Sequence, residues 1–138
     1  MTETLCSRLI DALLAAGIPA FPEYPGRLPP IPDAPGFVTV SAEQEETGEP
    51  VLLPQNGTAV PVLIRLRVRS HACTWEDLRA VSGRAEQCIC TVLSELRLDV
   101  RKTVRGEITY QKTLDRLVQE YLVMIRGMLF SEEDDDAD

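Results

Sequence analysis

The sequence predicts an α+β fold, in which a mostly antiparallel sheet of four to five strands carries two helices packed on it. Two observations lead to this prediction. In the segment 58–69, apolar side chains at every second position from Val62 to Val68 face one way, and beyond Leu63 arginines face the other, a pattern typical of a half-buried strand. Residues 74–96 instead repeat apolar side chains at every third and fourth position, as a helix with one buried face does. The expected order along the chain is helix, strand, hairpin, helix, strand, strand.

The length of 138 residues suits one domain with a substantial core. We expect residues 1–130 to form that domain and residues 131–138 to be a disordered tail, because the tail contains six acidic side chains and no basic ones. Hydrophobic residues make up 44% of the chain but aromatic residues only 5%, so the core is expected to be mostly aliphatic.

The sequence shows no sign of export or membrane insertion. No stretch approaches the roughly 18 consecutive apolar residues that span a bilayer, and the N-terminus lacks the basic start and apolar run of a signal peptide. We therefore expect a cytoplasmic protein with no membrane partner. The four cysteines at positions 6, 73, 88 and 90 are expected to stay reduced.

The first half of the chain is expected to begin with a helix over residues 4–16. A loop follows over residues 18–35, which contain seven of the ten prolines and so lack many backbone donors. A strand is predicted over residues 36–43. The polar residues 43–50 are then expected to form a turn.

A β-hairpin is the next predicted element. Residues 51–55 and 58–69 flank Asn56-Gly57, the pair preferred in tight hairpin turns because both residues tolerate positive φ. In the second strand, one face is apolar and the other carries Arg65, Arg67 and Arg69. This alternation predicts a strand with a buried face and a basic outer face.

In the second half, Thr74 and Asp77 have the spacing of a capping box at the start of the helix 74–96. Residues 98–114 are expected to be extended, with Gly106 breaking or bulging the run. Residues 115–130 fit both a helix and a strand. We favour the strand, because β-branched and aromatic residues favour it and a partner strand precedes it.

Charge is unevenly distributed along the chain. Residues 1–61 carry two basic and eight acidic side chains, whereas residues 62–130 carry twelve basic and eight acidic ones. If the two parts fold to opposite surfaces, copies could attract one another head to tail; scattered, solvated charge is the simpler alternative. The net charge of −8 disfavours nucleic acid as a partner. The candidate interface residues are Arg65, Arg67, Arg69, Arg101, Arg105, Glu43, Glu45 and Glu46.

Residues suited to catalysis are scarce. His71 is the single histidine and is expected in a surface loop, and no Walker A loop, Gly-x-Gly-x-x-Gly or Gly-x-Ser-x-Gly motif occurs. The sharpest metal hypothesis joins His71 and Cys73 with Cys88 and Cys90, but this spacing does not match the common zinc motifs. We therefore expect no enzyme activity, no bound metal and no cofactor.

The chain resembles the tail-terminator and tail-completion proteins of tailed phages and related contractile particles. The resemblance rests on the element order, on the chain length, and on the look of two segments: residues 60–69 before the helix 74–96, and the closing stretch 105–130. The resemblance covers residues 3–130. It implies a ring, usually hexameric, at the end of a tail tube or at the head–tail junction. The implied partners are further copies of the chain and tube, sheath or connector proteins. The alternative is an adaptor or chaperone-type module that binds one dedicated protein.

Overall fold

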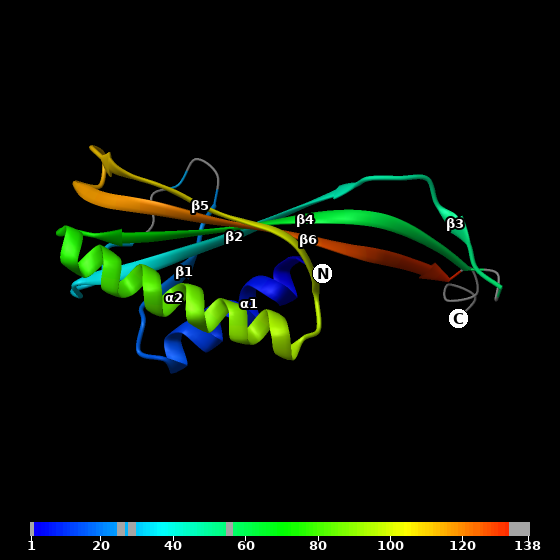
Figure 1. Ribbon diagram of the computed structural model, residues 1–138, viewed down its shortest axis with the longest axis horizontal. Coiled ribbons are helices and arrows are strands. Elements are labelled where there is room, and N and C mark those ends of the chain that lie inside the picture. Colours follow the sequence, from blue (N-terminus) through cyan, green and yellow to red (C-terminus); the bar gives the residue numbers. More distant parts are fainter. Residues whose placement is uncertain (1, 25–26, 28–29, 55–56, 133–138) are drawn as a thin grey trace.

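The structure is a computed structural model that describes residues 2–24, 27, 30–54 and 57–132 (Figure 1). Within these residues it is an α+β fold with two helices and a six-stranded, mostly antiparallel sheet, which confirms the predicted fold class. Two of the strands are shorter than any predicted from the sequence. The elements are α1 (Thr2–Ala15), β1 (Ala20–Pro22), β2 (Gly36–Glu46), β3 (Val51–Leu52), β4 (Gly57–Ala72), α2 (Trp75–Glu95), β5 (Asp99–Gln111) and β6 (Arg116–Glu132).

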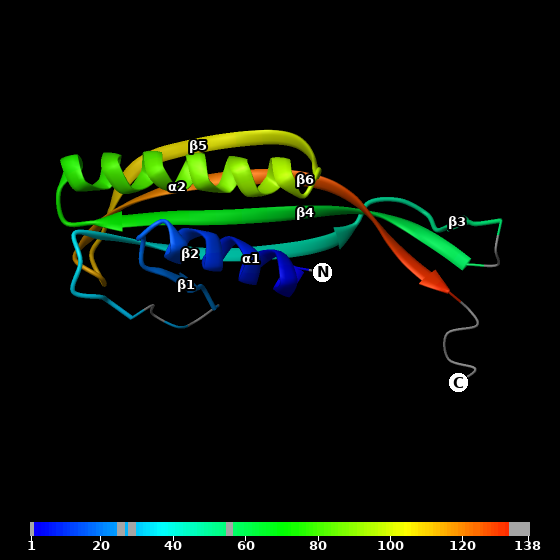
Figure 2. The same cartoon turned by 90° about the horizontal axis from the view of Figure 1, so that it is seen from below.

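The strands lie in the order β1-β2-β4-β6-β5, and β3 pairs with β4 beside this path. Only the pair β1–β2 is parallel. Both helices lie on the same side of the sheet (Figures 1 and 2). We call this side the helix face and the other side the open face.

The core lies between the helices and the helix face. The predicted alternation of β4 is confirmed, because its apolar side chains on the helix face are buried. On the side away from the sheet, the core is covered by leucines spaced three to four residues apart on α1 and by a longer apolar stripe on α2. The main buried residues are Leu5, Leu9, Leu13, Val62, Ile64, Leu66, Val68, Leu78, Ala85, Ile89, Val123 and Ile125. The core is aliphatic, as the composition predicted.

The predicted cap of the second helix is present. Thr74 lies just before α2 in an extended conformation, and its side chain accepts a hydrogen bond from the backbone N–H of Asp77 at 3.1 Å. This bond satisfies one of the amides that a helix start leaves without an intrahelical partner.

Two predictions about the first half of the chain are wrong. The predicted loop 18–35 contains the short strand β1, which lies at the sheet edge, where a proline such as Pro22 is tolerated because its missing N–H interrupts no ladder. The predicted turn at residues 43–50 begins too early, because β2 continues to Glu46 along the long partner strand β4. Both differences arise from pairing with distant segments.

The predicted hairpin forms between β3 and β4, where Leu52 pairs with Thr58. Gly57 is the first residue of β4, and Asn56 lies outside the described residues. At the other end of the chain, β6 includes Ser131 and Glu132, the first two residues of the predicted tail. Residues 133–138 lie outside the described part.

The strand prediction for residues 115–130 is confirmed, because β6 pairs with both β4 and β5. β5 carries irregularities between Val100 and Lys102 and between Arg105 and Ile108. The second surrounds Gly106, which confirms the predicted bulge. β4 and β6 run on past β1, β2 and β5 and form, with β3, a projecting arm (Figure 2). Neither described helix is long and apolar enough to cross a membrane.

Candidate functional site

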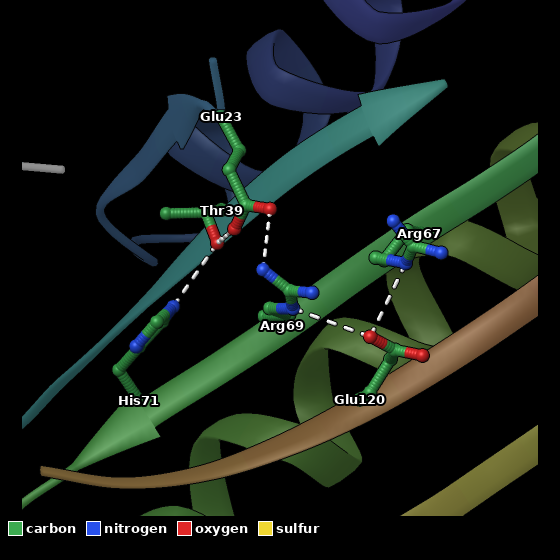
Figure 3. Close-up of polar contacts among 6 residues, drawn as sticks. All are labelled: Glu23, Thr39, Arg67, Arg69, His71 and Glu120. Carbon is green, nitrogen blue, oxygen red and sulfur yellow. Dashed lines mark hydrogen bonds and ion pairs between the residues drawn. The ribbon is translucent and has the colours of Figure 1, made fainter. Parts of the chain in front are cut away.

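The predicted arginine ladder is present on the open face, but its charges are paired within the molecule. β4 lies between β2 and β6, so acidic side chains of both neighbours reach its arginines. Arg65 lies 2.7 Å from Glu45 of β2. Arg67 and Arg69 each lie 3.2 Å from the same carboxylate oxygen of Glu120 on β6 (Figure 3). The ladder is therefore an internal ion-pair network.

Glu23, just after β1, joins this network to a buried polar pair (Figure 3). Its Oε2 accepts a hydrogen bond from Arg69 Nη1 at 2.6 Å, and its Oε1 accepts one from the hydroxyl of Thr39 at 2.8 Å. Arg69 Nε also donates to Glu120 Oε2 at 3.2 Å. Arg67 Nε lies equally near that oxygen but is not oriented to donate to it. Sequence reasoning missed Glu23 and Glu120, because neither belongs to a local pattern.

The prediction that His71 lies in a surface loop is wrong. β4 continues to Ala72, so His71 is a strand residue, and only 2% of it is exposed. Its ring stacks on Phe37 of β2, and its Nε2 lies 3.0 Å from the hydroxyl oxygen of Thr39. The alternation of β4, continued past Arg69, would have placed His71 on the open face.

The hydrogen bonds determine the tautomer of His71. The Thr39 hydroxyl has a single proton, which it donates to the carboxylate of Glu23. Nε2 of His71 must therefore carry the proton that it shares with Thr39, and Nδ1 is left without a hydrogen-bond partner. Burial, together with the nearby charges of Arg69 and Arg116, lowers the pKa of His71 to about 4. The imidazole is thus neutral at pH 7, where it has a packing role.

The four residues of the zinc hypothesis do not come together. His71 faces Thr39 on the open face, whereas Cys88 and Cys90 belong to α2 on the helix face. No group of three or more histidine, cysteine or acidic side chains suited to a metal occurs among the described residues. In that same part of the chain the cysteines carry free thiols.

Among the described residues, two open strand edges lie at opposite sides of the sheet. On one side, β5 pairs only with β6, so the backbone groups along its outer edge have no strand partner. On the other side, β1 covers β2 only as far as Val40. Residues 41–46 of β2 are therefore unpaired on the side away from β4 among the described residues, and we call this segment the β2 free edge. Unpaired edges are places where another strand can add.

The two edges differ in charge. The β2 free edge carries three acidic and no basic side chains, and Glu43 and Glu46 form no ion pair among the described residues. β5 carries Arg101, Lys102 and Arg105 against two acidic side chains. Arg105 is held by Glu86 of α2 at 2.6 Å, and Arg101 approaches Asp99 at 3.5 Å. The eight candidate interface residues thus divide between the internal network on β4 and these two edges.

A groove of about 880 Å³ lies beside the β2 free edge, between that edge and the first turns of α1. Its apolar lining includes Cys6, Ile10 and Ala42, and its acidic lining includes Glu3, Asp11 and Glu43. The groove begins where β1 ends, at Pro22. It therefore combines an unpaired strand edge, an overhanging helix and negative charge.

Comparisons with protein-family models and with curated proteins find no match to this chain.

Proposed function

We propose that this protein is a structural assembly protein that associates with copies of itself head to tail and has no catalytic role. The single observation that carries the proposal is the pair of open strand edges of opposite charge at the two sides of one sheet. An acidic edge and a basic edge attract each other, whereas two copies of the same edge repel.

The placement of these edges favours an open or cyclic repeat over a symmetric dimer. A two-fold dimer would pair one edge with itself and bring like charges together. A contact between unlike edges is heterologous, and it produces a ring if the rotation between copies closes or a filament if it does not. The charge pattern therefore supports a heterologous repeat, of which a ring is the closed form.

The finer form of the proposal is a tail-terminator-like ring component of a phage tail or phage-derived contractile particle. It is supported by the resemblance in the order of helices and strands. That order includes a closing strand, which is β6 in this protein. Its partners would be tube, sheath or connector proteins, and its place would be in the assembled particle.

A second candidate function is an adaptor that binds one dedicated protein. The groove beside the β2 free edge favours it, because an open edge next to an apolar wall can take up an extended peptide as an added strand. Co-purification of one stoichiometric foreign protein, in place of self-association, would decide for this function.

The test is the mass of the full-length protein in solution, measured by light scattering over a range of concentrations. We expect a homo-oligomer that dissociates as salt is added, because salt screens attraction between exposed charges. The double variant Glu43→Lys, Glu46→Lys should shift the equilibrium to the monomer. The matched control Glu76→Lys, Glu95→Lys makes the same charge change on α2 and should leave the oligomer intact. A wild-type monomer at high concentration contradicts the proposal.

A further inference from the structure

We propose that the groove between α1 and the β2 free edge receives residues 99–104 of β5 from a second copy, as an added antiparallel strand. This inference rests on the proposed self-association and specifies its interface. Four features of the two surfaces favour a second copy of the chain as the occupant of the groove. They are the direction of the strands, their position along the sheet, the apolar surface that each leaves exposed, and their charge.

Strand direction allows the pairing. β4 is antiparallel to both β2 and β6, and β6 is antiparallel to β5, so β2 and β5 run in opposite directions within one sheet. An identical copy placed beside the first in the same orientation therefore presents its β5 antiparallel to β2. The helix faces of the two copies then lie on the same side of one continuous sheet.

The two segments also lie at the same level of the sheet. Following the pairs across the strands, Lys102 is level with Met124, Arg65 and Glu43, and Val104 is level with Leu122, Arg67 and Ser41. A sideways step without any shift along the strands thus brings residues 99–104 to the β2 free edge. The second half of β5 would arrive level with β1. The irregularity between Arg105 and Ile108 lies at this level, and a bulge bends its strand.

Each surface supplies what the other lacks. The first half of β5 lies at the edge of the sheet beside α2, and Val100 and Val104 are each 39% exposed. The groove has α1 on one side and β2 on the other, but no described strand pairs with the β2 free edge there. Val100 and Thr103 pair with buried residues of the helix face of β6, so in the groove they would point toward α1 and its Cys6 and Ile10.

Charge completes the fit. Lys102 pairs with Met124 on the open face, at the level of Glu43, so the two side chains would meet on the same face across the new strand pair. Lys102 forms no ion pair with the described residues of its own copy, and neither does Glu43. Opposite charges directly across neighbouring strands stabilise a sheet, whereas like charges there destabilise it.

The native thiol of Cys6 provides the test. In a Cys73→Ser, Cys90→Ser background, Thr103→Cys places a thiol on the helix face of β5. Cys90 is removed because it lies within 3.7 Å of the Tyr121 hydroxyl and so near position 103. Burial raises the pKa of the Cys6 thiol, so oxidation is carried out at mildly alkaline pH. Non-reducing electrophoresis and peptide mapping then identify the linked residues.

We expect a ladder of cross-linked multimers joined between Cys6 of one copy and position 103 of the next. The matched control Val104→Cys, one residue along on the opposite face, should give no link to Cys6, and Cys6→Ser should abolish the ladder. If light scattering shows the oligomer but the Cys6 link to position 103 is absent, this interface is wrong and self-association stands. If the protein is monomeric, both proposals fall.

Discussion

The imidazole of His71 stacks on the ring of Phe37, with ring centroids 4.5 Å apart and planes inclined by 1°. The two residues are direct cross-strand neighbours on β4 and β2. Phe21 of β1 packs edge-on against Phe37 from the other side, with centroids 6.2 Å apart. These rings form a small apolar cluster on the open face, apart from the main core beneath the helices, and His71 is its titratable member.

Acid should destabilise the protein through His71. The unfolded chain takes up a proton on His71 below about pH 6.5, whereas the folded protein does so only near its pKa of about 4. Stability therefore falls as the pH drops through this window, by about 3 kcal/mol in all. Chemical denaturation of the wild type and His71→Phe at a series of pH values measures the effect. The difference between the two free energies of unfolding should change across the window, and parallel curves would contradict the prediction.

Removal of the Glu23 carboxylate should loosen the network on the open face. Glu23→Ala deprives Thr39 of its acceptor and Arg69 of one of its two carboxylate acceptors. Because these groups are partly exposed and can bind water instead, we expect a loss of about 1–2 kcal/mol. The control Glu46→Gln changes an exposed carboxylate with no ion pair among the described residues and should stay within about 0.5 kcal/mol of the wild type. Equal stabilities of the two variants in urea would refute the role given to Glu23.

Two glycines should respond to alanine with opposite sign. A Cβ at Gly36 would lie 3.0 Å from Cγ1 of Val81 and 3.1 Å from the carbonyl oxygen of His71, so β2 and α2 would have to move apart. We expect Gly36→Ala to cost about 1–3 kcal/mol. Gly83 lies within α2 with open space around its Cα, so Gly83→Ala should stabilise the helix by about 0.5–1 kcal/mol. Thermal melting of both variants checks the pair. If both substitutions changed the stability in the same direction, the close approach of β2 to α2 would not be what determines the effect at Gly36.

The cap of α2 should contribute measurably to stability. Thr74→Ala removes the acceptor of the Asp77 amide and should cost about 1 kcal/mol. Thr91 serves as the control. Within the described part of the chain its hydroxyl bonds only to the carbonyl of Gln87 in the same helix, and alanine is a better helix former than threonine. Thr91→Ala should therefore be neutral or slightly stabilising. A neutral Thr74→Ala, measured by urea denaturation, would mean that water replaces the cap.

Several features were predictable from the sequence because they depend on neighbours along the chain. The alternation of residues 62–68 placed β4, the apolar stripe of residues 78–96 placed α2, and Thr74 marked its start. Local patterns of this kind reflect backbone periodicity, which is 2 in a strand and 3.6 in a helix. They settled the fold class and the face on which Arg65, Arg67 and Arg69 lie.

The partners of those side chains were not predictable in this way. Glu120 reaches Arg67 and Arg69 because β6 returns beside β4, and Glu23 reaches Arg69 because β1 docks along β2. The sequence patterns allowed either a helix or a strand over residues 115–130, and pairing with β4 and β5 decided it. The burial of His71 likewise depends on Phe37, which is its neighbour only through the β2–β4 register.

By itself, the sequence determined the α+β class, the central strand β4, the helix α2 and the uneven distribution of charge, because periodicity and composition are local properties. Only the tertiary structure decided that the arginine ladder is neutralised from both sides, that His71 is buried, and that the acidic end of β2 and the basic strand β5 lie at opposite open edges. These features depend on the order and register of strands. Strand order and register result from pairing between residues far apart in the chain, which no local pattern encodes.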